Sequence, residues 1–494
     1  MMETAILWVI VIGYMTFIFI KGVSKVKEID TTDDFLLAGR NVGWLFLFCT
    51  MGATVIGGGA SIGAIGRTYD WGILMVLVST GWYIHFLFSG LVVAPQFRAA
   101  KLYTVAGFFG HRYGEGPRFV ALVLSLLFSV FIVAAQMAAF GSVLSAILPQ
   151  FADSAVVLKL AILIGGTMVV IYSTAGGLKA VIQTDVYQFI ILFIGFCITV
   201  AFCLPDLLHI DGATLRKLPA TFFSPHGGKG WVMLITTFLA FLLGETFAPG
   251  YATRYCVGKN IKETRRGIAG VGIFLAFTFP IILFVIALYA RIHFPDIDPQ
   301  QALPMVIRQL NNPVIAGLIV GALLMAVMSS ADSALNSSTA IFVKDLFEHQ
   351  LGWTDSKERP LLKIARICSC VLGGIAILIA ILWSDIIQLL LFTYHVWAPA
   401  VILPVIVGAV MKERSVRYGR HVFITMVVST VSAMLYKGAL TLHGKGTAIL
   451  PDSCYVIMEK VDTSVFGVLV SLVVFTVTVL VVHTSPEPMI SDPS

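Results

Sequence analysis

Stretches of about 20 mainly apolar residues recur along the whole chain, and a helix of that length crosses the hydrocarbon core of a bilayer. Hydrophobic residues make up 58% of the 494 residues and charged residues only 12%, about half the charged share of a soluble domain. The sequence therefore predicts an all-α polytopic membrane protein with about thirteen transmembrane helices. We expect these spans near residues 4–20, 43–65, 73–94, 119–148, 157–174, 185–205, 231–253, 267–290, 313–343, 364–383, 386–411, 420–436 and 464–483.

The distribution of lysine and arginine predicts the orientation of the chain. Lys21, Lys25 and Lys27 follow the first expected span directly, and most basic residues fall on the same side as these three. Cytoplasmic loops are the lysine- and arginine-rich ones, so we expect the N-terminus outside and, after an odd number of spans, a cytoplasmic tail at 484–494. The net charge of +6 then reflects topology, and no nucleic-acid partner is implied.

The loops are too short for a separate catalytic domain, so we expect one transport domain over residues 1–494. The expected partners are the lipid bilayer and a small-molecule substrate, with no obligate protein partner evident. Short loops favour a plasma membrane location of the bacterial inner-membrane kind.

Two expected spans contain clusters of helix-breaking residues. The second span carries "MGATVIGGGASIG" (51–63), and the seventh carries "LLGETFAPGY" (242–251). Glycines can simply permit close helix packing. The two spans lie five apart, however, which is typical of transporters built from inverted repeats whose broken helices meet at a midplane site. We therefore expect a first repeat over 43–205 and a second over 231–411, with residues 4–20 and 420–483 peripheral.

The ninth span contains the polar stretch "AVMSSADSALNSS" (326–338). Ser329 and Ser333 share one helix face, and Asp332 lies three residues after Ser329. Serines alone can bond back to the carbonyl four residues earlier. An unpaired carboxylate at this depth costs several kcal/mol, so the aspartate favours a cation site built from hard oxygen ligands.

A second carboxylate, Asp185, lies at the start of the sixth expected span in "STAGGLKAVIQTDVYQF" (173–189). Its side chain can cap the N-terminus of that helix. If Asp185 and Asp332 converge, their charges need compensation, and neither the sixth nor the ninth span contains a lysine or arginine. Bound cations would then provide it.

These segments together resemble the sodium:solute symporter family. The resemblance covers nearly the whole chain and rests on "LAGRNVGWLFLFCTMGATVIGGG" (37–59), "GGLKAVIQTDVYQ" (176–188), "TRYCVGKNIKETRRG" (253–267) and "AVMSSADSALNSS". It implies a LeuT-type 5+5 core with one extra helix in front, and one or two sodium ions as coupling ions.

The resemblance also implies positions for the ions. The main sodium site would lie between two spans. The broken second span would provide Ala53 and Ile56, and the polar ninth span would provide Ala326, Ser329 and Ser330. Some members of the family have a second site, and the matching positions here are Asp185, Ser329, Asp332 and Ser333.

Within the family, the motifs look most like the branch that contains the high-affinity choline transporter. That branch holds a quaternary ammonium between tryptophans. Here Val55 or Ile56 occupies the position before the triple glycine, Ala248 lies in span seven, and span four offers Gln136 instead of a tryptophan. The cage of that branch is absent, so choline is not expected. The expected substrate pocket comprises Thr54, Gly57, Gly58, Gln136, Glu245, Thr246 and Ala248.

Glu245 beside the second helix break has three open interpretations. It can bind a substrate amine or guanidinium, relay protons, or pair with a partner that the sequence does not reveal. His85 and His395 are more simply read as packed helix residues. The leading function is sodium-coupled symport of a small organic solute by alternating access. Alternatives are coupling to protons, transport of a small carboxylate or another neutral solute, and a transporter-like sensor. A channel or an enzyme fits less well because no filter ring or catalytic motif occurs.

Overall fold

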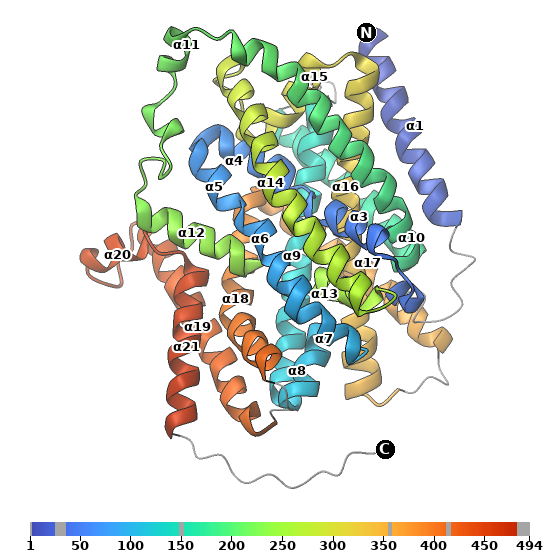
Figure 1. Ribbon diagram of the computed structural model, residues 1–494, viewed down its shortest axis with the longest axis vertical. Helices are drawn as coiled ribbons and strands as arrows, with labels where there is room; N and C mark the ends of the chain where they lie inside the picture. The colour runs from blue at the N-terminus through green and yellow to red at the C-terminus, as the bar shows by residue number, and fades with distance from the viewer. Residues whose placement is uncertain (1, 25–35, 148–152, 354–357, 412–415, 482–494) are drawn as a thin grey trace.

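The computed structural model describes residues 2–24, 36–147, 153–353, 358–411 and 416–481 (Figure 1). Helices make up most of this part of the chain, and an isolated backbone bridge joins Val42 to Gly258. The predicted all-α fold class is confirmed. Lys25, Lys27 and the expected tail at 484–494 lie outside the described residues, so the predicted orientation stays a prediction.

Long helices occupy the places where spans are expected. They are α1 (Met2–Ser24), α3 (Trp44–Val55) with η3 (Gly59–Gly63) and α4 (Ala64–Trp71), α5 (Ile73–Ser79), α6 (Gly81–Phe88), η4 (Ser89–Val93) and α7 (Ala94–Ala99), α9 (Glu115–Ile147), α10 (Ser154–Leu208), α12 (Trp231–Gly244) with α13 (Pro249–Val257), α14 (Ile261–His293), α16 (Pro313–Ala340) with η7 (Ile341–Gln350), α17 (Glu358–Leu382), α18 (Ile386–Val410), α19 (Gly419–Gly444) and α21 (Thr463–Val481). Short helices between them include α8 (Val105–Tyr113), α11 (Gly212–Lys217), α15 (Ala302–Leu310) and α20 (Asp452–Met458).

The number of spans is only partly settled by these helices. Among the described residues, nine segments are long and apolar enough to cross a membrane, and two bent pairs raise this number to eleven. Two shorter apolar helices, Ala5–Phe17 and Arg366–Leu382, lie where spans one and ten are expected. The count of thirteen therefore stays a prediction.

Both predicted helix breaks are confirmed. The axis turns by 56° between α3 and the helical segment Gly59–Trp71, and by 48° between α12 and α13. The first break falls at the triple glycine. The second contains Phe247, whose backbone φ of +64° is unusual for a residue with a side chain, followed by Pro249 at the first turn of α13.

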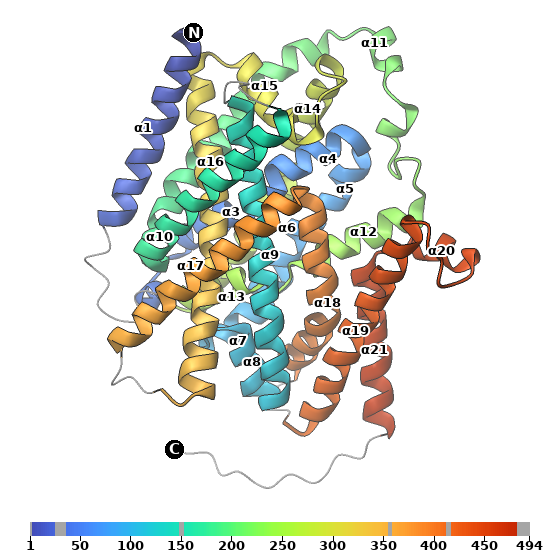
Figure 2. The same ribbon diagram turned by 180° about the vertical axis from the view of Figure 1, so that it is seen from behind.

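The helix α16 lies between α1 and α9 and packs against α9, α10 and α1 (Figures 1 and 2). Nearly all its side chains beyond Leu318 are buried, including the whole polar stretch from Ser329 to Thr339. By contrast α1 lies at one edge of the molecule, and α19 and α21 lie at the opposite edge (Figure 2). Many apolar side chains on α1, α19 and α21 are exposed, as expected of helices that face lipid.

The α10 helix covers the fifth and sixth spans that the sequence predicts. It is helical from Ser154 to Leu208 and contains two apolar segments, Ser154–Ile171 and Val181–Leu208. Asp185 therefore lies inside a helix, with helical residues on both sides. The interpretation of Asp185 as an N-terminal cap is wrong, because the residues before it are helical.

Candidate functional site

A cavity lies where the two helix breaks face each other. Its volume of about 40 Å³ is room for roughly two or three water molecules. Residues from α3, η3, α6, α9, α13, α16 and α18, together with the second break, form its wall. They are Thr54, Val55, Gly59, Ala60, Trp82, Phe128, Ser129, Ile132, Gln136, Glu245, Ala248, Gly250, Tyr251, Ser330, Ser333, Ala334 and Leu390.

Glu245 is the acidic residue of this wall, and two tyrosines hold its carboxylate. The Tyr251 hydroxyl donates to one carboxylate oxygen and the Tyr394 hydroxyl donates to the other, each at 2.6 Å. No basic side chain of the described residues forms an ion pair with Glu245. The partners of Glu245 that the structure shows are therefore two hydroxyl groups and no basic side chain of the described residues.

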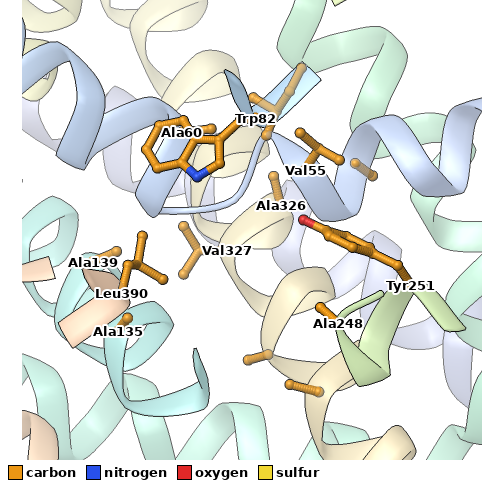
Figure 3. Close-up of a cluster of buried hydrophobic side chains, with 14 of the residues drawn as sticks. Val55, Ala60, Trp82, Ala135, Ala139, Ala248, Tyr251, Ala326, Val327 and Leu390 are labelled. Carbon is orange, nitrogen blue, oxygen red and sulfur yellow. The ribbon is translucent and has the colours of Figure 1, made fainter. Parts of the chain in front are cut away.

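Aromatic rings surround the cavity although the expected tryptophan positions hold small or aliphatic residues. The Trp82 indole nitrogen donates to the Tyr394 hydroxyl at 2.9 Å, which joins α6 to α18. The Trp82 and Tyr251 rings extend from different helices toward the same space, beside Val55 and Ala60 (Figure 3). Phe128 from α9 adds a third ring to the wall. These rings could not be predicted as one group from the sequence, because each comes from a different helix.

Most residues of the expected substrate pocket lie at this cavity. Thr54, Gln136, Glu245 and Ala248 belong to its wall. Gly57 and Gly58 lie directly behind it, where the Gly58 amide donates to the Gln136 side-chain oxygen at 2.8 Å. Thr246 is the exception, because its hydroxyl bonds back to the Leu242 carbonyl and its own carbonyl accepts from Trp397.

The expected main sodium site lies beside the same cavity, at the contact between α3 and α16. The Ser330 hydroxyl donates to the Thr54 carbonyl at 2.8 Å and lies 3.2 Å from the Ala326 carbonyl. Ala53, Ile56 and Ala326 are all fully buried there. Hydroxyl and carbonyl oxygens from both helices thus converge, and this donor set suits a hard cation. Serine hydroxyls also bond to carbonyls four residues earlier within α16, since Ser333 donates to the Ser329 carbonyl at 2.6 Å.

Asp185 has a basic partner that the sequence analysis did not anticipate. Arg254 of α13 is 0% exposed, and its guanidinium donates to the Asp185 carboxylate at 3.2 Å and to the Ser333 hydroxyl at 2.7 Å. Thr50 and Ser329 also donate to Asp185. A bound cation is therefore not needed to balance the charge of Asp185. In the sequence Arg254 resembles a loop residue, because four other basic residues follow it by position 266.

Asp332 does not join this group of hydrogen-bonded residues. Its carboxylate accepts from Ser173 of α10, and its second oxygen has no hydrogen-bond partner. The structure thus brings Asp185, Ser329 and Ser333 together around Arg254 and places Asp332 on a different contact. Whether any of these residues binds sodium stays a prediction.

The two histidines singled out in the sequence lie in different surroundings. His85 is buried, stacks near Phe86 and Tyr251, and makes no hydrogen bond through either ring nitrogen. His395 lies 3.4 Å from the Asp462 carboxylate and links α18 to the start of α21. Neither residue belongs to the cavity wall.

Comparison with known proteins gives consistent results. Residues 35–429 match the model of the sodium:solute symporter family. The chain is 27% identical to the high-affinity choline transporter 1 of Caenorhabditis elegans over 413 residues, which is 78% of this chain and 69% of that protein. It is 24% identical to the high-affinity proline transporter PutP of Bacillus subtilis, over 85% of this chain and 89% of that one.

A solved structure of a Na⁺-coupled sialic acid symporter has the same fold. It superposes with a TM-score of 0.76 at 21% identity, over 98% of this chain and 99% of that one. The predicted LeuT-type architecture is therefore confirmed. These relatives are transporters by name, which supports the expectation of a transporter over an enzyme.

Proposed function

Because the chain belongs to the sodium:solute symporter family, we propose that it is a sodium-coupled symporter that takes up a small organic cation by alternating access. The substrate would carry a protonated amine or a guanidinium group. One observation supports this proposal most strongly: the Glu245 carboxylate lies in the wall of the cavity between the two helix breaks without a basic partner.

The Glu245 site favours a cationic substrate on electrostatic grounds. An uncompensated carboxylate away from bulk water gains a large stabilisation from a cation that donates hydrogen bonds to it. The rings of Trp82 and Tyr251 offer apolar and cation–π contacts to the rest of the molecule. Gln136 and Thr54 add polar groups that can orient a second functional group.

Sodium would bind next to this cavity, between α3 and α16. The proposed ligands are the carbonyls of Ala53, Ile56 and Ala326 and the hydroxyls of Ser329 and Ser330. Ser330 belongs both to this set and to the cavity wall. An ion there would hold α3 against α16 and complete one wall of the substrate cavity, which couples the two binding events.

We further propose that one sodium ion is coupled to each substrate. Asp185, which a second site would need, is already balanced by Arg254. We also keep the predicted arrangement of one transport domain in a plasma membrane of the bacterial inner-membrane kind, with the N-terminus outside. The repeats at 43–205 and 231–411 remain part of this proposal.

A substrate screen on the purified protein tests the proposal. Thermal stabilisation would be measured with amines, guanidines, quaternary ammonium compounds, amino acids, carboxylates and sugars, each in sodium and in potassium buffer. We expect primary amines or guanidines to stabilise the protein in sodium only. Glu245→Gln should weaken their binding about 10- to 150-fold, the scale of a hydrogen bond to a charged group, while sodium binding persists.

The matched control is Glu459→Gln, which changes an exposed glutamate directly after α20, outside the cavity wall. A quaternary ammonium compound as the best ligand would favour the aromatic wall over hydrogen bonding to Glu245. A carboxylate or sugar that binds Glu245→Gln normally would contradict the proposed substrate class and favour a proton-carrying or packing role for Glu245. Sodium-independent binding without uptake would favour a sensor.

A further inference from the structure

A second cavity lies far from the central one, where α1, α15 and the first turns of α16 meet. These helices lie together at the end of the molecule that carries the N-terminus (Figure 2). The cavity has a volume of about 610 Å³, and its wall includes Leu7, Arg308, Asn311 and Asn312. We call it the outer cavity, because this end faces the outer surface of the membrane in the proposed orientation. It then lies near the lipid headgroups.

The polar groups of the outer cavity are not satisfied within the described part of the protein. Arg308 is exposed and forms no ion pair with a described acidic residue. Asn311 is only 6% exposed, and its side-chain nitrogen donates to the Ile307 carbonyl at 3.0 Å. The side-chain oxygen of Asn311 has no hydrogen-bond donor, although buried polar atoms nearly always have a partner.

The charge of the outer cavity favours an anionic ligand. Arg308 provides a full positive charge, and the N-terminus of α16 adds a partial one, since Asn312 and Pro313 lie in the wall. None of the described residues that line the cavity is acidic. The unpartnered oxygen of Asn311 requires in addition that the ligand donate a hydrogen bond. A phosphate group that carries a hydroxyl-bearing substituent meets both requirements.

An apolar cavity of about 250 Å³ lies deeper between the helices α1, α10 and α16. It is lined by Ile12, Met15, Thr16, Met168, Ile171, Met325 and Met328. Met325 and Met328 are buried, whereas Ile12 and Ile171 are 57% and 60% exposed, so the cavity is open toward the lipid. Methionine side chains adapt to irregular shapes, which suits a flexible hydrocarbon chain.

The two cavities lie at a distance that one lipid molecule can span. Helices α1 and α16 run side by side in the same direction, since Gly317 lies against Leu7 and Gly321 against Tyr14. Both helices continue from the outer cavity to the apolar cavity, over residues 7–15 in α1 and 316–325 in α16. At 1.5 Å per residue this is about 12–14 Å, within the roughly 15 Å that one leaflet contributes to the hydrocarbon core.

We propose that α1, α10 and α16 bind one anionic phospholipid of the phosphatidylglycerol kind. The phosphate accepts hydrogen bonds from the Arg308 guanidinium, a glycerol hydroxyl donates to Asn311, and one acyl chain occupies the apolar cavity. Phosphatidylethanolamine fits less well, because no carboxylate in the wall faces its ammonium group. The bound lipid holds the peripheral helix α1 against α16. The site depends neither on sodium nor on the proposed substrate.

Lipid binding to the purified, delipidated full-length protein tests this site. Native mass spectrometry in detergent would measure the affinity for phosphatidylglycerol, phosphatidic acid and phosphatidylethanolamine, each added alone. We expect phosphatidylglycerol to bind more tightly than phosphatidylethanolamine. Arg308→Gln should weaken its binding at least about fivefold, the scale of one basic residue at a membrane surface. The matched control is Arg216→Gln, which changes an exposed arginine of α11 and should bind as the wild type does.

Two further variants test the other parts of the site. Asn311→Leu should weaken the binding of phosphatidylglycerol but not of phosphatidic acid, because phosphatidic acid lacks the glycerol hydroxyls. Ile171→Trp fills the apolar cavity from its exposed rim and should weaken the binding of both anionic lipids. Its control is Ile281→Trp, which adds the same bulk at a 62% exposed position of α14.

Three results would overturn the lipid site. Equal affinities of the wild type and Arg308→Gln for phosphatidylglycerol, or a preference for phosphatidylethanolamine, would exclude the proposed headgroup contacts. Binding of soluble glycerol phosphate as tight as that of phosphatidylglycerol would assign the outer cavity to a free anion. An unchanged affinity for phosphatidylglycerol in Asn311→Leu and Ile171→Trp would assign the unpartnered oxygen to a buried water molecule and leave the apolar cavity without a specific occupant.

Discussion

Ser329 and Ser330 differ in what their hydroxyl groups contact, although they are neighbours on α16. Ser330 reaches the Thr54 carbonyl across the helix interface, whereas Ser329 donates to Asp185. A single residue thus bridges α3 and α16 at the proposed main sodium site. Its neighbour joins that site to the buried Asp185–Arg254 pair. Changes at the two positions should therefore differ in their effect on stability even if both remove a sodium ligand.

Replacing both serines by alanine should abolish sodium-dependent uptake. Alanine has the highest helix propensity, so α16 itself should persist while two hydroxyl ligands are lost. Uptake into liposomes would be measured over a range of external sodium concentrations, together with the amount of folded protein. Ser338→Ala serves as the control, because Ser338 is equally buried on α16 and its hydroxyl donates to the Ala334 carbonyl at 2.8 Å. Uptake with an unchanged half-saturating sodium concentration would contradict the assignment of the main site.

The Asp185–Arg254 pair should stabilise the fold only while both partners are present. Both side chains are 0% exposed. Arg254→Met leaves a buried carboxylate without its cation and should cost about 3–5 kcal/mol, a large share of the stability of a typical protein. Replacing both residues in Arg254→Met/Asp185→Leu removes the unpaired charge, so the double variant should melt at a higher temperature than Arg254→Met.

Thermal unfolding of the purified variants in detergent checks this expectation. Arg266→Met offers a control, since Arg266 lies among the basic residues at the start of α14 and stacks on the Trp44 ring rather than pairing with a buried acid. The single variant Asp185→Leu would be measured as well. If the losses of stability in Arg254→Met and Asp185→Leu sum to the loss in the double variant, the two residues are not coupled. Asp185 would then again be open to a bound cation.

The sequence showed the acids and serines of the site but not their partners. Serine and aspartate at bilayer depth are conspicuous within an apolar run, so Ser329, Ser330, Asp332 and Glu245 could be named in advance. Arg254 follows the second break in a segment rich in basic residues and looks like part of a loop. Its burial depends on Asp185, 69 residues earlier in the chain. No local sequence pattern predicts a contact between two residues so far apart in the chain.

The broken helices were the most predictable elements of the fold. Three consecutive glycines in one span, and Gly244, Pro249 and Gly250 around Glu245 in the other, weaken the helix at both places. The continuity of α10 was less predictable, because the glycines before Asp185 look like a loop in sequence. Packing in the folded protein decides whether such a segment stays helical, and local propensity is a weak guide there.

Replacing Gly58 at the first break tests whether the close contact of η3 with α9 is needed for the substrate cavity. A methyl group on Gly58 would lie 2.1 Å from the Ala139 side chain of α9 and 3.3 Å from the Gln136 side-chain oxygen. Gly58→Ala should therefore push η3 away from α9 and disturb the hydrogen bond from the Gly58 amide to Gln136. We expect loss of substrate binding, and a melting temperature lowered by an overpacking cost of about 1–3 kcal/mol.

Gly438→Ala is the matched control for this change, because a methyl group on Gly438 of α19 meets no atom within 4 Å. It should leave substrate binding intact and raise helix stability slightly. Ligand-dependent melting curves of the two variants provide the comparison. Normal substrate binding by Gly58→Ala would show that η3 and α9 can separate without disturbing the cavity, and would weaken the link between the break and the site.

The whole molecule places its charges in two classes. Exposed basic and acidic residues lie mainly in loops, whereas Asp185, Arg254, Glu245 and Asp332 lie among the buried helices, as does Asp345, which pairs with Arg118 at 2.7 Å. Among the described residues, Asp185 and Arg254 pair with each other, whereas Glu245 at the cavity and Asp332 on α16 form no ion pair with a basic side chain. In the proposed loaded state a substrate cation balances Glu245, and one sodium ion binds between α3 and α16.

The proposed stoichiometry of one sodium ion and one substrate cation predicts the net charge that crosses the membrane in each transport cycle. One sodium ion with one monovalent cationic substrate carries two positive charges inward, each driven by about 2.3 kcal/mol per 100 mV of membrane potential. Liposomes with set potassium diffusion potentials and known sodium and substrate gradients give the potential at which net uptake stops. We expect that potential to correspond to two charges per substrate.

A value of one charge per substrate would indicate a neutral or zwitterionic substrate, which would contradict the proposed role of Glu245. A value of three would require a second coupled sodium ion, and then the pairing of Asp185 with Arg254 would have to break during the cycle.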